Sequence, residues 1–312
     1  MLGSWEAGGG CRLGYRTYEP IRATVSTWGI IPAAGEGSRI QPLGFSKALL
    51  PVGSRFDDEA EHPRALAEHL VERMIAGGAR KICFVVSPDK SDICEYFGER
   101  IDDVEITYVV QPRPVGLCDA LFRASGVVGE DENVLIGLPD TLWFPVEGFD
   151  LMPDNQLSLL LFPVRQPQLC DAVLTDSTNC VCEICVGQLQ SSSFWTWGAV
   201  KMPGHILHCL HELWRQPGHQ DENFGTLVNA YLAQGGTAVG VRAGIAYVDV
   251  DTVAGYRDAI RLVSGAALAP IPSPQPAQGG YTDGWRPLTA ANYASTFPQQ
   301  RIELEPLHRS ER

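Results

Sequence analysis

The residues of this chain that are best placed to do chemistry follow an apolar segment near its start. Residues 28–31 (WGII) are typical of a buried strand. The loop after them carries Gly35 and Gly37, which let main-chain N–H groups approach an anion with no side chain in the way. Arg39 and Lys47 add two positive charges. The combination predicts a site for a polyphosphate.

Two common phosphate-binding loops and a plain turn fit this segment less well. A Walker A loop requires Gly-Lys-Ser/Thr after its first glycine, which is absent. A dinucleotide-binding fingerprint requires a third glycine where Ile40 stands, so that the next helix can pack closely. An ordinary glycine-rich turn would explain the glycines, but it would not explain Arg39, Pro42 and Lys47 ahead of an apolar Leu-Leu-Pro-Val segment.

Further polar groups stand where other predicted strands end. Gln111 leads through a Pro-Arg-Pro turn to Gly116. Its amide could recognise the edge of a base, and the glycine could let a planar ring lie against the backbone, although a plain turn is the alternative. Asp140 follows a buried strand, at the sheet edge where ligands bind. A carboxylate there can hold a hard cation, although a loop or capping aspartate is the alternative.

A late acidic pair completes the candidate chemistry. In an extended strand, Asp249 and Asp251 would point to the same side. One of them could hold a metal ion while the other caps the following helix. Thr252 is a further candidate for that cap.

Alternating strands and helices would have to position these groups. Strands are predicted at 28–32, 81–87, 106–111, 133–138, 157–164, 179–186 and 196–200, with two short ones inside 238–250. Helices are predicted at 63–75, 117–124, 203–214, 223–233 and 252–263. Continuous apolar strands alternating with helices indicate an α/β fold with a parallel sheet covered on both faces.

Composition and charge bound the class of protein. The chain has 312 residues, of which 45% are hydrophobic and 20% charged, as in soluble globular proteins. The net charge of -13 repels nucleic acid and anionic membranes, so neither is an expected partner. No apolar stretch approaches the length of a membrane span. The nine scattered cysteines are best explained as reduced thiols in a cytoplasmic protein.

The chain is expected to have one ordered part between two less regular ones. Residues 1–26 are Gly-rich, lack the apolar centre of a signal peptide and are predicted to form a flexible extension. Residues 27–265 carry all the predicted elements. Residues 266–312 begin with a Pro-rich linker and show no clear period, which predicts a poorly ordered tail.

In their order along the chain, these motifs resemble the sugar-1-phosphate nucleotidyltransferases, in particular the glucose-1-phosphate thymidylyltransferases and uridylyltransferases. That family has a G-x-G-x-R loop, a Lys-x-Leu-Leu-Pro segment, a Gln-Pro element that ends in Gly-Leu, a strand-end Asp and a late Asp-x-x-Thr. The matching residues here are Gly35, Gly37, Arg39, Pro42, Lys47, Leu50, Pro51, Gln111, Gly116, Asp140, Asp249 and Thr252. The resemblance extends over residues 27–263.

The resemblance implies a nucleotide site and a metal site. The residues that would cradle the nucleotide are Ala33, Ala34, Gly35, Gly37 and Ser38. Gln111 and Gly116 would contact the base. Asp140 and Asp249 would hold Mg²⁺.

The two cations have distinct implied roles. Arg39 would grip the β- and γ-phosphates, and Lys47 would lie between the α-phosphate and the incoming sugar phosphate. The physics is consistent with this, because a sugar phosphate is already largely dianionic at neutral pH and needs no general base. Repulsion between the phosphates and charge on the leaving pyrophosphate are the obstacles, and cations and oriented N–H groups counter both.

The resemblance also implies the fold and the reaction. The fold would be three-layer α/β/α and Rossmann-like, with a mixed, mostly parallel central sheet. Residues 27–145 would form the nucleotide-binding half and residues 146–265 the sugar-binding half. The enzyme would be a Mg²⁺-dependent nucleotidyltransferase that makes dTDP- or UDP-glucose and pyrophosphate from dTTP or UTP and a sugar 1-phosphate. Relatives assemble, so the resemblance is compatible with a homo-oligomer, although the sequence does not give the oligomeric state.

One family segment is missing. Residues 182–188 (CEICVGQ) stand where the family has Glu-Lys-Pro, which holds the sugar and its phosphate. Lys201 is a candidate substitute. The alternatives left open are a cytidylyl- or guanylyltransferase for another phosphorylated acceptor, and a non-catalytic nucleotide-binding regulator.

Two clusters with metal-ligating side chains are predicted to be structural. The alternating cysteines of residues 180–185 favour packed thiols on a strand over a zinc site, because paired C-x-x-C spacing is absent. His205, His208 and His211 are three residues apart and should share a solvated helix face.

Overall fold

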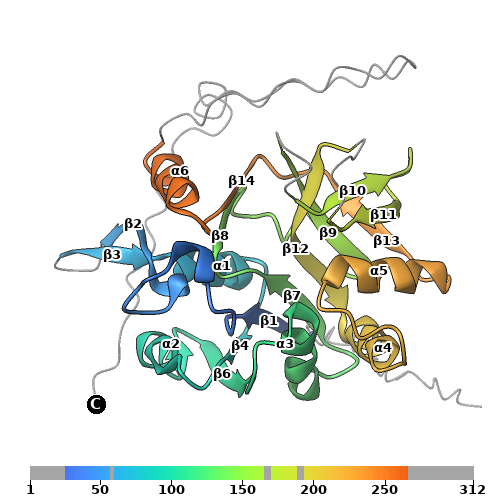
Figure 1. The fold of residues 1–312 in the computed structure, drawn as a ribbon, viewed down its shortest axis with the longest axis horizontal. Coiled ribbons are helices and arrows are strands. Elements are labelled where there is room, and N and C mark those ends of the chain that lie inside the picture. The colour runs from blue at the N-terminus through green and yellow to red at the C-terminus, as the bar shows by residue number, and fades with distance from the viewer. Residues whose placement is uncertain (1–24, 57–59, 165–169, 188–192, 266–312) are drawn as a thin grey trace, which may run out of the picture.

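Apolar strands form the centre of the molecule, and they run parallel there. The computed structural model describes residues 25–56, 60–164, 170–187 and 193–265. Four neighbouring parallel strands lie in the order β7-β1-β4-β6 (Figure 1). Their bounds are Thr27–Pro32 for β1, Lys81–Val86 for β4, Val104–Val110 for β6 and Asn133–Gly137 for β7. Apart from Thr27 and Lys81 at their starts, β1 and β4 present mostly aliphatic and aromatic side chains to both faces, which requires cover on each side.

Further strands extend this centre into a ten-stranded sheet, and all of their pairings are antiparallel except the parallel pairing of β13 with β9. The long strand β12 (Trp195–Pro203) pairs antiparallel with β7 and with β9 (Leu157–Pro163). The remaining members are β5 (Arg100–Ile101), β10 (Ala172–Thr175), β11 (Val181–Cys185) and β13 (Ala238–Val241). A mixed sheet with a parallel centre is therefore confirmed.

Helices cover both faces of the sheet. One face carries α3 (Leu117–Ala124), α4 (Gly204–Trp214) and α5 (Phe224–Ala233), and the other carries α1 (Leu66–Ala76) and α2 (Ser91–Phe97). Neighbouring residues of β1 divide between the two cores, since Ile30 packs with the first helix layer and Ile31 with the second. The three-layer arrangement is confirmed.

Two small sheets lie outside the main one and had not been predicted. The hairpin of β2 (Pro51–Phe56) and β3 (Glu61–Ala65) packs beside α6 (Val253–Val263). Because Glu61–Ala65 pairs with β2, the helix predicted from residue 63 begins only at Leu66. The second small sheet pairs β8 (Thr141–Phe144) with β14 (Ala246–Asp249).

The β8–β14 pair matters most for function, because it joins distant parts of the chain. Asp249 lies opposite Thr141, and the Val250 N–H donates to the Asp140 carbonyl at 2.9 Å. In addition, the buried Arg73 of α1 donates two hydrogen bonds, of 3.0 and 2.6 Å, to the carbonyl of Trp143 in β8. The backbone that carries the acidic residues is therefore fixed from two sides.

Residues 1–24 and 266–312, which include most of the predicted extension and the predicted tail, lie outside the described residues. In the part that is described, no helix is long and apolar enough to cross a membrane. All eight cysteines in that part are free thiols.

One buried histidine predicts how stability should depend on pH. His69 of α1 is 3% exposed, its Nε2 lies 2.9 Å from the Val52 carbonyl oxygen, and burial lowers its pKa from 6.5 to about 3. The unfolded chain therefore gains a proton below pH 6.5 that the folded chain does not bind, so stability falls as the pH drops from 6.5 towards 3. Between pH 6.5 and 5 this residue should cost about 2 kcal/mol of unfolding free energy.

The measurement is urea unfolding at the two pH values. We expect His69→Gln, whose amide can still donate to Val52, to lose about 2 kcal/mol less than wild type over this interval. His205→Gln replaces an exposed histidine and is the matched control. Equal losses in wild type and His69→Gln would contradict the assignment.

Candidate active site

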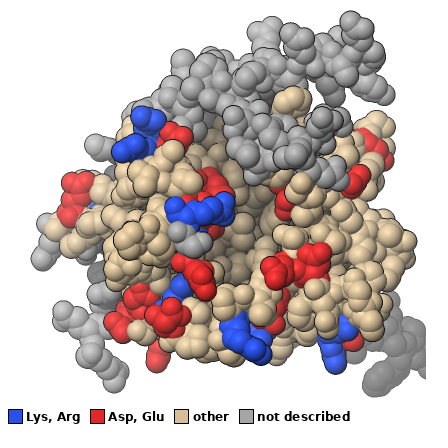
Figure 2. All heavy atoms as spheres, in the orientation of Figure 1, with Lys and Arg blue, Asp and Glu red and all other residues tan. Residues whose placement is uncertain are grey.

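The candidate site lies where the carboxyl ends of the parallel strands meet. The loops that follow β1, β4, β6 and β7 all reach this edge, which is where open α/β sheets bind ligands. A cavity of about 450 Å³ opens among the first three loops. Its lining includes Ala34, Glu36, Phe45, Lys47, Lys90 and Pro112. In Figure 2 a hollow opens near the middle of the molecule, and basic and acidic side chains lie together at its edge.

The loop after β1 has the properties of an anion cradle. The Ala33 N–H continues the sheet by donating to the Val85 carbonyl at 2.7 Å. Within the described chain, no hydrogen bond occupies the N–H groups of residues 34–37. Gly37 has a φ of 62°, which favours glycine, and it turns the chain into a short 3-10 turn at Ser38–Ile40. The N–H groups of residues 34–37 are therefore free to bind an anion, whereas the N–H of Ala33 is already bonded within the sheet.

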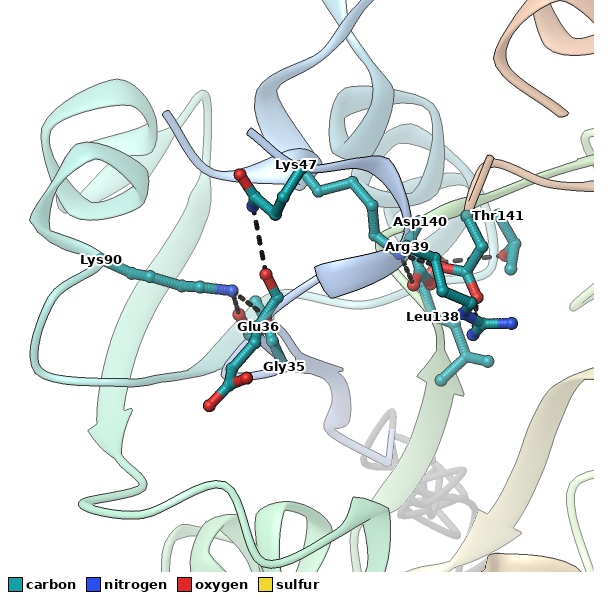
Figure 3. Close-up of polar contacts among 11 residues, drawn as sticks. Gly35, Glu36, Arg39, Lys47, Lys90, Leu138, Asp140 and Thr141 are labelled. Carbon is teal, nitrogen blue, oxygen red and sulfur yellow. Dashed lines mark hydrogen bonds and ion pairs between the residues drawn. The ribbon is translucent and has the colours of Figure 1, made fainter. Parts of the chain in front are cut away.

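The two predicted cations, Lys47 and Arg39, both pair with the carboxylate of Asp251. Lys47 is 9% exposed, and its Nζ lies 2.6 Å from Asp140 Oδ2. The same ammonium also bonds Asp251, and so does the guanidinium of Arg39, whose side chain is 72% exposed. Figure 3 shows the Lys47 side chain reaching toward Asp140.

Asp251 is a site residue that sequence reasoning placed only as a possible partner of Asp249. The helix cap is Thr252, whose Oγ1 accepts from the Gly255 N–H at 3.1 Å, so the alternative of an Asp251 cap is wrong. Asp251 is 8% exposed and turns toward Lys47 instead. The i, i+2 spacing of the two aspartates, with a better cap next to them, was the signal for its role.

Three carboxylates form a group suited to a hard cation. One oxygen from each of Asp140, Asp249 and Asp251 lies within 4.8 Å of the others. Partial burial and, second to it, the negative charge of Asp140 together raise the pKa of Asp249 to about 6, against the opposing effect of Lys47 and Arg39. Excess negative charge in a partly desolvated oxygen cluster fits Mg²⁺. Elsewhere in the described chain, no other group of three such side chains comes together.

The predicted base-contact residues are explained by local packing. Gln111 is 2% exposed, and its Nε2 donates to the Gly116 carbonyl at 3.1 Å and to Asp119 Oδ2 at 2.8 Å. Gly116 has a φ of 98°, and a Cβ there would lie 2.6 Å from Cβ of Glu222. The side of Gly116 expected to face a base is therefore filled by Glu222. Base contact by either residue stays a prediction.

Lys201 does not substitute for the missing family lysine. It is 6% exposed, and its Nζ donates to the carbonyls of Phe149 and Met152, each at 3.1 Å. It also pairs with Asp154 at 2.6 Å. These three partners use all three ammonium protons, so the interpretation of Lys201 as a sugar-binding group is wrong.

The three histidines of α4, His205, His208 and His211, are less exposed to solvent than predicted. Only His205 is exposed, whereas His208 Nε2 lies 2.8 Å from the Val128 carbonyl oxygen. His211 Nδ1 lies 2.9 Å from Ser125 Oγ, and its ring stacks on Phe122 at 4.8 Å. These histidines hold α4 to the segment after α3.

Sequence comparison finds similarity to known nucleotidyltransferases in the first half of the chain. Residues 28–150 match the nucleotidyl transferase family model. A stretch of 120 residues is 31% identical to the glucose-1-phosphate thymidylyltransferase of Neisseria meningitidis and covers 37% of this chain and 38% of that protein. A stretch of 133 residues is 29% identical to the UTP–glucose-1-phosphate uridylyltransferase of Mycoplasma pneumoniae and covers 35% and 43%. Both matches span less than half of the relative's length.

Similarity of fold reaches further than similarity of sequence. A solved structure of UTP-bound UGPase from Acinetobacter baumannii matches with a TM-score of 0.62 at 20% identity, over 77% of this chain and 94% of that one. The predicted nucleotidyltransferase fold is therefore confirmed. The predicted resemblance to the sugar-1-phosphate nucleotidyltransferases is confirmed by the family match and the named relatives.

Proposed function

We propose that this protein transfers a nucleotidyl group from a nucleoside triphosphate to a sugar 1-phosphate, forming an NDP-sugar and pyrophosphate. The favoured substrates are dTTP or UTP with glucose 1-phosphate, and the cofactor is Mg²⁺. One observation carries the proposal: Lys47 and Arg39 meet three carboxylates beside a loop whose N–H groups at residues 34–37 are free. Residues 27–145 would bind the nucleotide and residues 146–265 the acceptor.

The chain's own residues would position and neutralise the phosphates. The free N–H groups of residues 34–37 would bind phosphate oxygens, and Arg39, which is exposed on the loop, would reach the β- and γ-phosphates. Lys47 would lie between the α-phosphate and the acceptor phosphate. Mg²⁺, held by Asp140 and Asp249 with Asp251 in reach, would supply positive charge against the triphosphate.

The reaction needs no proton-abstracting residue. An oxygen of the acceptor phosphate would form a bond to the α-phosphorus while the bond from that phosphorus to the bridging oxygen breaks and pyrophosphate leaves. Fixed cations and N–H dipoles would stabilise this in-line displacement, because they require no reorganisation as charge moves to the leaving group.

The decisive experiment is a pyrophosphate-release assay that scans four nucleoside triphosphates against several sugar 1-phosphates with Mg²⁺. We expect turnover above background with dTTP or UTP and glucose 1-phosphate. Fastest turnover with CTP or GTP and another phosphorylated acceptor would identify the first alternative enzyme. Triphosphate binding without turnover for any pair would identify a regulator.

The acceptor half supplies a specific reason to include other acceptors in this scan. Lys201, the candidate for the family's sugar-phosphate lysine, is fully used by structural partners. The scan therefore includes phosphorylated acceptors whose recognition does not depend on a second lysine.

A further inference from the structure

The start of α2 contacts both the loop after β1 and the segment that carries Lys47, although it belongs to none of the motifs found in the sequence. Lys90 immediately precedes α2, and its Nζ donates to the carbonyl of Ala33 at 2.7 Å and to the carbonyl of Gly35 (Figure 3). Figure 3 shows the lysine reaching across to the loop from the side opposite Asp140. The two partners lie more than fifty residues earlier in the chain.

These contacts determine where the loop's N–H groups point. In a trans peptide unit the C=O and the following N–H point in opposite directions. An ammonium bonded to the carbonyls of Ala33 and Gly35 therefore directs the N–H groups of Ala34 and Glu36 away from itself. Gln41 Nε2 donates to the Glu36 carbonyl at 3.2 Å and directs the Gly37 N–H in the same manner.

Asp92 holds the other part of the motif. Its Oδ2 accepts from the Ser46 N–H at 2.6 Å and its Oδ1 from the Ser46 hydroxyl at 2.7 Å. Oδ1 also accepts from the Ile93 N–H at 2.9 Å, which fixes the carboxylate to its own helix. Ser46 is 8% exposed and directly precedes Lys47. The backbone that aims Lys47 is therefore tied to α2.

We propose that Lys90 and Asp92 are positioning residues that hold the anion-binding loop and the backbone of Lys47 in the geometry that binds a triphosphate. The identity of the ligand rests on the proposed function. In this role Lys90 acts through its hydrogen bonds to the carbonyls of Ala33 and Gly35. The alternative role would be direct attraction of the phosphates by its positive charge.

Nucleotide affinity, measured by calorimetry with Mg²⁺-dTTP and Mg²⁺-UTP, tests the role of Lys90 without requiring turnover. Charge-assisted hydrogen bonds predict a Kd about tenfold weaker in Lys90→Met. Lys90→Arg, which keeps donors for both carbonyls, should recover most of the affinity. Lys81→Met is the matched control. Lys81 is the first residue of β4, pairs with Glu132 at 3.5 Å and lies outside the lining of the cavity.

Salt separates positioning from charge. Attraction through solvent is screened, so a purely electrostatic role would make the loss in Lys90→Met shrink between about 0.05 and about 0.5 M NaCl, where the Debye length falls from about 14 to about 4 Å. A positioning role predicts the same ratio of Kd values at both salt concentrations. A loss that vanishes at high salt, or an Arg variant no better than the Met variant, would overturn the role of Lys90.

Asp92 is tested in the same assay. Asp92→Asn is expected to weaken binding about fivefold, because the Ser46 N–H and hydroxyl lose a charged acceptor. Asp103→Asn, at an exposed position, is the control. Unchanged affinity in Asp92→Asn would overturn its role. If wild type binds neither triphosphate, the proposed function fails and the inference fails with it, whereas wild-type binding with unaffected variants overturns the inference alone.

Discussion

Asp249→Asn is expected to lower Mg²⁺-supported turnover about a thousandfold, because an amide replaces one of the negative charges that would hold the cation. Asp249 isolates this effect well. Among the described residues it forms no ion pair, so its replacement leaves Lys47 and Arg39 with their partners. The measurement is the steady-state rate at pH 8, well above the pKa of about 6 to which burial raises the Asp249 carboxyl.

Asp140→Asn gives a companion measurement with a different expectation. Asp140 also pairs with Lys47 at 2.6 Å, so its replacement should remove a metal ligand and also one of the two carboxylate partners of the lysine. We therefore expect a loss of turnover at least as large as in Asp249→Asn. Asp103→Asn changes an exposed carboxylate and serves as the control for the chemistry of the substitution. Wild-type rates in either site variant would refute its assignment to the metal.

The central strands and the long helices could be predicted because each carries its own signal. Residues 81–86 form an almost wholly apolar run, and α3 begins and ends where the pattern predicted. The hairpin β2–β3 was missed because Pro51, Gly53 and Pro63 are residues that strands usually exclude. Helix α2 has only seven residues, too few for a period to stand out.

The contacts of the candidate site also divide into those that the sequence could predict and those that it could not. Lys47, Asp140 and Asp249 stand in recognisable motifs at predicted strand ends, so type and spacing were enough to select them. Their partners depend on tertiary contacts. The bond from Lys47 to Asp251 joins residues 204 apart, and the bond from Lys90 to the Ala33 carbonyl joins residues 57 apart. No local pattern carries such information.

Lys47 occupies the position where a bound cation would otherwise balance the acidic cluster, and this predicts an unusual response to metal. Lys47→Met should lower turnover about a hundredfold, because the site loses a fixed cation aimed at the phosphates. It should also lower the unfolding free energy by about 2 kcal/mol, because Asp140 and Asp251 lose a partner in a largely buried place. Mg²⁺ should then raise the melting temperature of the variant more than that of wild type, since no ammonium competes for the carboxylates.

Thermal melts with and without Mg²⁺ distinguish this from simple loss of a buried lysine. Lys201→Met is the matched control, because Lys201 is 6% exposed where Lys47 is 9% exposed, and its partner Asp154 lies outside the acidic cluster. Both variants should melt below wild type, but only Lys47→Met should gain from Mg²⁺ beyond the wild-type shift. An equal Mg²⁺ shift in all three proteins would mean that Lys47 and the cation do not share these carboxylates, and a metal site at Asp140 would then be wrong.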